Sequence, residues 1–480
     1  MAKELKALRY IDEKKHIFTG LSDSIWSFAE TGYTEYKSAA AIKEVLRQEG
    51  FEIEDKLCGI DTAFCGSFGS GKPVIGILAE YDALAAMSQK SGELEQSPEA
   101  EGGNGHGCGH NLLGAGSVAA AVAVKEYLKE GNKEGTVILF GCPAEENGSG
   151  KAFLARGGAF DSLDAAITWH PGDTAAVMPT GTLANIECAY CFKGKAAHAA
   201  AAPHLGRSAL DAVELMNVGA NYLREHIVSD ARLHYAVSNA GGASPNVVQA
   251  YAEVIYLIRA PHISDVQEIY ERVNDIARGA ALMTGTAVEI KFIKACSDFL
   301  QNRTLQQVLA KAAEEVGTPE YSKEERDTAK EYMETLGADA AAIAKQEYQM
   351  VVMAAGKEAA DQIKPLLGRP INEFMLPYRS SSIVMPASTD VGDVSHICPT
   401  AQLGTVTCAA GTPGHSWQMV AQGKLPLAHK GMLQAAKSLA LAAIELYEKP
   451  EILEEAQKEY KAAGQGYSSP IPEDVKPRII

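Results

Sequence analysis

Residues 72–79, Lys-Pro-Val-Ile-Gly-Ile-Leu-Ala, form a short apolar run that is typical of a strand buried on both faces. An alanine-rich stretch over 112–127 has the composition of a helix, and residues 136–141, TVILFG, indicate a second buried strand. Strands that alternate with helices favour a parallel sheet with helices on both faces. We therefore expect an α/β fold with a mostly parallel main sheet flanked by helices.

The pattern changes after residue 185. Strands and helices then follow in the order β-α-β-β-α-β, which is typical of a ferredoxin-like unit, over residues 186–193, 207–227, 233–239, 247–259, 265–283 and 288–293. We expect this α+β unit to be an inserted lid or dimerisation domain, which divides the chain into 1–185, 186–296 and 297–480. Residues 321–364 are charged and alanine-rich, and predict a peripheral helical insertion with no evident chemistry.

The composition excludes several classes of protein. The formal net charge of −17 argues against nucleic acid or an anionic membrane surface as the main partner. No apolar run is long enough to span a bilayer, and Met1–Lys6 begins without the apolar core of a signal peptide. The nine cysteines are scattered, which indicates a reducing compartment, and we expect a cytoplasmic protein.

The segment Gly105-His106-Gly107-Cys108-Gly109-His110-Asn111 carries the first chemical signal. A thiolate and an imidazole are ligands suited to zinc or a similar divalent ion. In an extended segment, Cys108 and His110 would face the same side and reach one metal site. The alternative is a buried cysteine beside a loop histidine.

Polar side chains follow three apolar strand-like runs. Asp82 follows GILA, the pair Glu145-Glu146 follows VILFG, and His170 follows AAITW. Ligand sites in parallel sheets gather at the carboxyl ends of the strands, so these residues are expected at one edge. One carboxylate of an adjacent pair can bind a metal while its neighbour stays available as a base.

The alternatives for these residues are structural. Asp82 is either the carboxylate that orients a ligating histidine or the N-cap of a helix. Glu145 and Glu146 are otherwise a solvated pair, and His170 a buried histidine. His415 lies on the Gly/Pro-rich loop 411–417, where a plain surface role is the alternative.

The inserted unit offers a second group of polar residues. His198, Asn246 and Arg259 together could bind a carboxylate or stabilise an oxyanion, and loop capping or surface ion pairing is the alternative. Asp390 and Asp393 could support the site, although capping is the simpler role for them.

These motifs, taken together, resemble those of the M20 metallopeptidase family, and within it the amidohydrolase subgroup. The matching stretches occur in the family's order: EYDAL (80–84), GHGCGHN (105–111), PAEE (143–146), WHPG (169–172), KAAHAAAAPH (195–204) and GTPGH (411–415). The resemblance implies hydrolysis of p-aminobenzoyl-glutamate or a related aminoacyl amide, with release of an amino acid such as glutamate.

The resemblance also implies a role for each matching residue. The implied metal ligands are Cys108, His110, Glu146, His170 and His415, which would hold one or two ions of zinc or manganese in each copy of the chain. Glu145 would be the general base, Asp82 would orient a ligand, and His198 would stabilise the oxyanion, either in its own subunit or across a dimer. Asn246 and Arg259 would hold the substrate's carboxylate. A homodimer through the lid is implied, with a homologous but different partner chain as the alternative.

Two positions depart from the family pattern. Asn111 stands where many relatives have Asp, and Glu80 replaces the first Asp of the more usual DMDAL. Neither change removes an implied ligand. Two other functions remain open: a dipeptidase or general N-acyl-amino-acid hydrolase, and a metal-binding subunit whose partner carries most of the catalysis.

Overall fold

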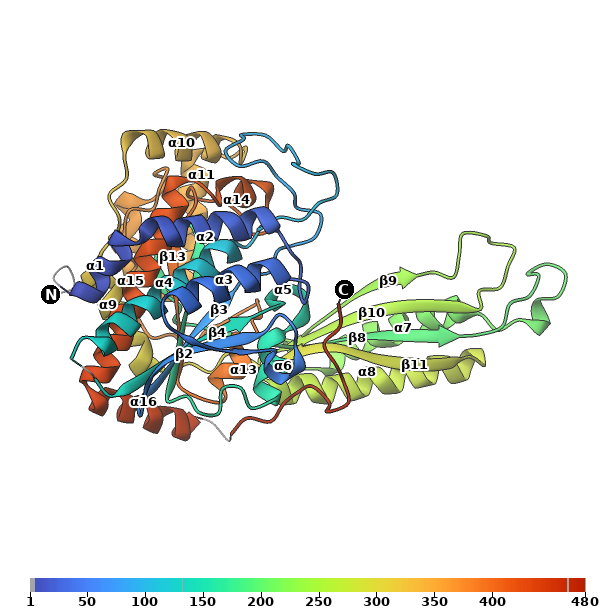
Figure 1. Cartoon of the computed structure of the whole chain (residues 1–480). Helices are drawn as coiled ribbons and strands as arrows, with labels where there is room; N and C mark the ends of the chain where they lie inside the picture. Colours follow the sequence, from blue (N-terminus) through green and yellow to red (C-terminus); the bar gives the residue numbers. More distant parts are fainter. Residues whose placement is uncertain (1–4, 132, 464–465, 480) are drawn as a thin grey trace.

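A computed structural model describes residues 5–131, 133–463 and 466–479. It consists of a large α/β part and a smaller elongated part that projects from it (Figure 1). Residues 1–4, which belong to the N-terminal segment considered above, lie outside the described residues. Within the described chain, no helix combines the length and apolar character needed to cross a membrane.

The large part is built on a seven-stranded sheet. Its strand order is β1-β2-β4-β3-β5-β13-β6. The four central strands, β4, β3, β5 and β13, pair in parallel, and the others pair antiparallel. The strands are β1 (Glu52–Asp55), β2 (Phe64–Ser70), β3 (Val74–Glu80), β4 (Gly135–Cys142), β5 (Ala165–Gly172), β6 (Ala176–Val177) and β13 (Thr400–Val406). The prediction of a mostly parallel main sheet is confirmed.

Helices cover both faces of this sheet. The helices of the large part are α1 (Lys6–Glu13), α2 (Lys15–Phe28), α3 (Tyr36–Gln48), α4 (His110–Lys129), α5 (Glu145–Gly148), α6 (Gly150–Arg156), α9 (Arg303–Val316), α10 (Lys323–Glu334), α11 (Ala340–Ala355), α12 (Lys357–Ile363), α13 (Val391–Ser395), α14 (Trp417–Gln422), α15 (Pro426–Glu448) and α16 (Pro450–Ala463). The predicted insertion at 321–364 is indeed helical.

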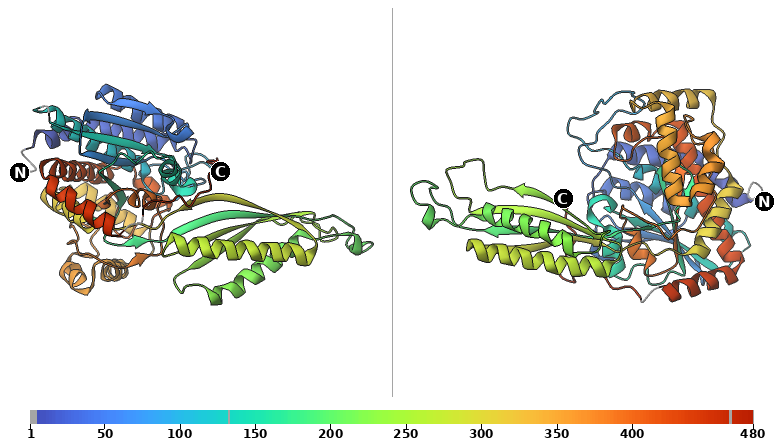
Figure 2. Two further views of the ribbon diagram at one scale, coloured as in Figure 1. Left: turned by 90° about the horizontal axis from the view of Figure 1, so that it is seen from below. Right: turned by 180° about the vertical axis from the view of Figure 1, so that it is seen from behind.

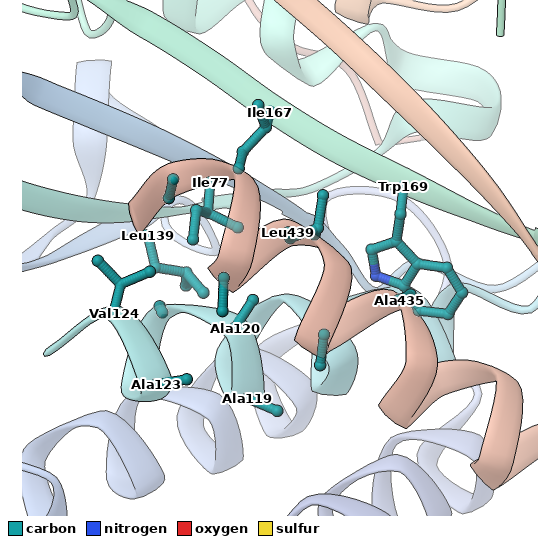
Figure 3. Packing of buried hydrophobic residues seen from close by; sticks show 14 of the residues in the cluster. Ile77, Ala119, Ala120, Ala123, Val124, Leu139, Ile167, Trp169, Ala435 and Leu439 are labelled. Atoms are coloured by element: carbon teal, nitrogen blue, oxygen red, sulfur yellow. The ribbon is translucent and has the colours of Figure 1, made fainter. Parts of the chain in front are cut away.

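The core lies between the sheet and the pair α4 and α15. Ile77, Leu139 and Ile167 from three neighbouring strands meet small residues of α4 such as Ala119 and Ala120 (Figure 3). Small side chains let the helix lie close to the sheet and remove apolar surface from water. Because α4 begins at His110, this packing fixes where that histidine lies.

The smaller part, residues 184–296, is called the lid here. Its sheet has the order β11-β8-β10-β9 and is antiparallel throughout, and α7 and α8 both lie on one of its faces (Figure 2). The elements are β8 (Ala184–Lys193), α7 (Ala209–Leu223), β9 (Arg232–Asn239), β10 (Tyr251–Ala260), α8 (Ile263–Thr284) and β11 (Ala287–Cys296). This is the expected β-α-β-β-α-β order.

One boundary in the lid differs from the sequence expectation. The strand predicted from residue 247 begins at Tyr251. Val247 and Val248 instead pair with the loop after β8, where Val248 N–H donates to Ala197 O at 3.0 Å. The apolar residues 247–248 therefore hold two loops together at the tip of the lid.

The chain enters and leaves the lid side by side, because Asn185 and Cys296 are register partners in β8 and β11. Short strands β7 (Gly181–Thr182) and β12 (Val384–Met385) pair in parallel next to this point. The division at 185/186 and 296/297 stays a prediction about domains.

Candidate metal centre

The site forms at the carboxyl ends of β3, β4 and β5, which are neighbours in the sheet. Asp82 follows β3 by two residues, Glu145 and Glu146 open the helix after β4, and His170 lies near the end of β5. Parallel strands present their carboxyl ends at one edge, so these side chains converge although they are far apart in sequence.

Cys108 and His110 reach the site through a turn. The sequence expectation of an extended segment is wrong here: Cys108 lies in a turn, Gly109 has φ of 75°, and His110 is the first residue of α4. The left-handed backbone at residue 109 is favourable only for glycine or a few polar residues. This bend still brings the Cys108 thiol within 3.3 Å of His170 Nε2.

Asp82 orients His110. Its Oδ1 lies 2.9 Å from His110 Nδ1, and its Oδ2 accepts the Glu146 backbone N–H at 3.0 Å. Burial raises the pKa of Asp82, but the neighbouring His110 outweighs this and lowers it below its usual range. An ionised Asp82 on Nδ1 leaves Nε2 as the atom that can bind a metal. The orienting role proposed for Asp82 therefore has matching geometry.

The turn before Glu145 has a strained backbone, which a side-chain hydrogen bond stabilises. Ala144 has φ of 58°, a conformation that costs a residue with a side chain about 1–2 kcal/mol. The carboxylate of the fully buried Glu35 accepts the Ala144 N–H at 2.8 Å and helps to hold it there. Burial raises the pKa of Glu145, and burial raises that of Glu146 to about 7.

His170 and His415 complete the cluster. His170 Nδ1 lies 2.7 Å from Pro171 O, which leaves Nε2 directed at Cys108. Burial lowers the pKa of His170 to about 4, so it is a neutral imidazole, the form that binds metals. His415 has φ of 57°, its N–H donates to Gly107 O at 2.8 Å, and its Nε2 lies 3.3 Å from Glu146 Oε2.

The side chains fit a divalent metal. Their donor atoms lie within 4.8 Å of one another in two groups that share Cys108: one with His110 and His170, the other with Glu146 and His415. Among the described residues, His110 Nε2 and Glu146 Oε1 are buried without a hydrogen-bond partner. Buried polar atoms without partners are costly, and a bound cation would satisfy both. A shared thiolate is suited to bridging two ions.

A third acidic residue lies beside this cluster. Glu80 Oε2 is 3.3 Å from His110 Nε2, and Glu80, His110 and Glu145 form a further group with metal-binding geometry. Glu80 Oε1 is held by Lys151 Nζ at 2.7 Å. The sequence departure at Glu80 therefore places a carboxylate next to a candidate ligand.

The second predicted group of residues does not come together within one chain. His198 and Asn246 lie in two exposed loops that meet at the tip of the lid, where the Ala199 N–H donates to Asn246 O at 2.9 Å. Arg259 lies at the opposite end of β10, and its Nη1 donates to Ser388 Oγ at 2.9 Å. Arg259 lies eight residues further along the strand than Tyr251, about 26 Å of chain.

Sequence reasoning missed two buried charged residues. Lys151 is fully buried and pairs with both Glu80 and Asp390, and Glu35 holds the turn at Ala144. A lone lysine inside the apolar run KAFLA was a usable signal for Lys151, whereas Glu35 stands in an ordinary polar segment. Asp390 contacts Lys151, and Asp393 accepts from Ser297, so both brace the structure behind the candidate ligands.

The sequence profile of Peptidase family M20/M25/M40 matches residues 76–365, which is more than half of the chain. The chain belongs to this family. The resemblance inferred from the motifs is thereby confirmed, and so is the class of enzyme, a hydrolase of the M20 type.

Two curated relatives from Escherichia coli (strain K12) are named as subunits of p-aminobenzoyl-glutamate hydrolase. The one designated B is 48% identical over 98% of this chain and 98% of its own length. The one designated A is 25% identical over 56% of this chain and 72% of its own length.

A solved structure supports the fold. The Bacillus subtilis YXEP protein, described as a dinuclear metal binding peptidase from the M20 family, is 17% identical, has a TM-score of 0.54, and covers 90% of this chain and 99% of its own.

Proposed function

We propose that this chain is a metal-dependent amidohydrolase that cleaves p-aminobenzoyl-glutamate or a related aminoacyl amide and releases glutamate or a similar amino acid. The observation that carries the proposal is the convergence of five candidate ligands around Cys108, with Glu145 beside them. The 48% identity to a p-aminobenzoyl-glutamate hydrolase subunit supports the substrate.

We propose Cys108, His110, Glu146, His170 and His415 as the metal ligands, with Cys108 shared between two ions. Thiolate and imidazole favour zinc, and the carboxylates also suit manganese. A divalent ion bound there supplies positive charge that polarises the scissile carbonyl and lowers the pKa of a water. Asp82 accepts a hydrogen bond from His110 Nδ1 and fixes the ring, so that Nε2 is the nitrogen offered to the metal.

Glu145 is the proposed general base. Its carboxylate removes a proton from the attacking water and then passes that proton to the leaving amide nitrogen. This side chain is partly buried, and the desolvation raises its pKa, which brings proton uptake closer to neutral pH. One residue thus serves as base and then as acid within a single turnover.

His198 is the proposed oxyanion donor. Its Nδ1 accepts the backbone N–H groups of Ala200 and Ala201 at 3.3 and 3.2 Å, so the ring proton of the neutral imidazole is on Nε2. An Nε2–H is the donor that a tetrahedral oxyanion needs. Because His198 lies at the lid tip, we propose that it acts, together with Asn246, on the site of a second subunit.

Arg259 is the proposed anchor for the substrate's carboxylate. A guanidinium binds a carboxylate through two parallel hydrogen bonds, which orients it as well as attracting it. Arg259 lies at the lid base next to Ser388 and belongs to the same chain as the metal ligands. We therefore propose that substrate binding combines Arg259 of one subunit with Asn246 of another.

Association through the lid supports this arrangement. β9 is an edge strand of the lid sheet, and it exposes Tyr235 and Val237, while Tyr222 on α7 is 75% exposed. An exposed edge with apolar side chains is a template for pairing with another strand. We propose a homodimer through this edge. The competing arrangement pairs this chain with a homologous but different chain, because the two Escherichia coli relatives carry the names of different subunits of a hydrolase.

Replacing the base tests the catalytic proposal. Glu145→Gln keeps the size of the side chain and removes its ability to take a proton. We expect hydrolysis of p-aminobenzoyl-glutamate to fall by about 10²–10⁴-fold, with the metal content unchanged by elemental analysis.

Glu101→Gln, in an exposed loop, is the matched control and should leave the rate unchanged. Substantial hydrolysis by Glu145→Gln with metal bound would refute the role of Glu145. Activity of the wild-type chain purified alone distinguishes a self-sufficient enzyme from a subunit that needs a different partner chain.

A further inference from the structure

A cavity of about 280 Å³ adjoins the metal centre. His170 forms part of its wall, together with the segment that follows β5, strand β13 and helix α11. The remaining wall is largely apolar and includes Met350, Met353, Phe374 and Leu376. Pockets of this kind bind small organic groups through apolar contact and a few placed polar atoms.

The position of the cavity ties it to the reaction site. His170 Nε2 faces Cys108, so a group that fills the cavity is in contact with a residue of the metal centre. Met385, also in the wall, lies three residues before Ser388, the residue that Arg259 contacts. The cavity wall thus includes one candidate metal ligand, His170, and the segment 385–388 leads from the wall to the contact of Arg259.

Helix α11 contributes two methionines, Met350 and Met353, to the wall of the cavity. It belongs to the helical insertion for which the sequence indicated no chemistry, and it lines a cavity that His170 also lines. Met350 and Met353 remain 52% and 43% exposed. Methionine side chains adapt their shape and make favourable sulfur contacts with aromatic rings.

Two buried amide side chains, those of Asn372 and Gln402, also belong to the wall of the cavity. Asn372 and Gln402 are 1% and 5% exposed, and among the described residues Asn372 Oδ1 and Gln402 Oε1 accept no hydrogen bond. Asn372 is held by its Nδ2, which donates to Glu347 Oε1 at 2.8 Å. Unpaired acceptors on residues that wall an apolar cavity favour a ring that carries a hydrogen-bond donor.

We propose that this cavity is the subsite for the acyl side of the substrate, and that it selects an aromatic acyl group bearing a hydrogen-bond donor such as an amine. Met350 and Met353 contact the ring, and Gln402 accepts from the donor. The inference rests on the proposed function, which supplies the amide bond beside His170, and it names the residues that decide which amides are cleaved.

Three glutamate amides distinguish the contact with the ring from the contact with its hydrogen-bond donor. The enzyme is first loaded with zinc or manganese. Released glutamate gives kcat/KM for 4-aminobenzoyl-, benzoyl- and acetyl-glutamate. We expect the double variant Met350→Ala/Met353→Ala to lose about tenfold on both aromatic substrates and less than about twofold on acetyl-glutamate. We expect Gln402→Met to lower the preference for 4-aminobenzoyl over benzoyl, with acetyl-glutamate again unchanged.

Met283→Ala, an exposed methionine on α8 of the lid, is the matched control and should change none of the three rates. Equal losses on all three substrates, or no loss on any, would overturn the subsite.

Binding of 4-aminobenzoate, measured by calorimetry, tests the subsite independently of hydrolysis. We expect binding to weaken about tenfold in the double methionine variant. Unchanged binding overturns the subsite whatever the rates are, whereas failure of the wild-type enzyme to hydrolyse any of the three amides counts against the proposed function alone.

Discussion

Lys151 places a fully buried positive charge beside the metal centre. It is fully buried, its Nζ lies 2.7 Å from Glu80 Oε1 and 2.5 Å from Asp390 Oδ1, and its backbone N–H donates to the other Asp390 oxygen at 2.8 Å. Burial lowers the pKa of Lys151, but the two carboxylates outweigh this and raise it well above its usual value. Lys151 is therefore charged and holds Glu80 next to His110.

Removing the Lys151 charge should be strongly destabilising. Lys151→Met leaves two buried carboxylates without their cation, and breaking such a pair costs about 3–5 kcal/mol of unfolding free energy. Urea unfolding followed by tryptophan fluorescence measures this change.

Lys72→Met is the matched control, because Lys72 pairs with Asp164 while its side chain is 74% exposed. Exposed pairs contribute about 0–1 kcal/mol. Similar losses of stability in the two variants would contradict the role assigned to Lys151.

At the scale of an element, helix α4 carries the site. It begins at His110, and its small residues let it approach the sheet closely. A side-chain carbon added at Gly116 would lie 2.7 Å from Trp169 Cζ2, and one at Gly114 would lie 2.8 Å from Glu80 O. The glycines in this helix thus set the separation between His110 and the strands that bear the other ligands.

Gly116→Ala should push α4 away from β5. Overpacking of this kind costs about 1–3 kcal/mol, which exceeds the gain in helix propensity of about 1 kcal/mol. We expect lower stability in urea and a reduced kcat, since His110 moves with the helix.

Gly279→Ala in α8 is the matched control, and it should change stability in the opposite direction, because nothing lies within 4 Å of the added carbon. It should stabilise the protein by about 0.5–1 kcal/mol. A stabilising effect of Gly116→Ala would show that the close approach at Trp169 imposes no constraint.

At the scale of the whole molecule, the separation between the lid tip and the metal centre decides whether His198 and Asn246 can act in their own subunit. The loops that hold His198 and Asn246 project away from the large part of the chain (Figure 1). If these residues act in catalysis, a second subunit has to bring them to the site. Activity should then depend on association through the lid.

Val237→Lys places a charge on the edge strand β9, and charges on an edge oppose strand pairing. We expect the variant to sediment as a monomer and to lose most of its activity, with metal content unchanged. Leu282→Lys on α8, where Leu282 is 84% exposed, should do neither. A fully active monomer would exclude a contribution of His198 from a second subunit.

The sequence by itself determined the order of strands and helices and the chemical identity of the candidate ligands. Apolar runs such as 74–80 and 135–142 are local signals, and residues that follow parallel strands must meet at one edge. Asp82, Glu145, Glu146 and His170 were therefore predictable as neighbours, and the lid's β-α-β-β-α-β order was predictable for the same local reason.

Only the tertiary structure decided how the remaining residues combine. It replaced the extended segment at Cys108 by a turn through Gly109, and it separated Arg259 from His198 by the length of β10. It also paired Lys151 with Asp390 and brought α11 and His170 into the wall of one cavity. These arrangements depend on contacts between residues far apart in the chain. Periodicity and motif spacing describe only residues that are close in sequence. Tertiary packing therefore sets these arrangements, and local sequence pattern does not.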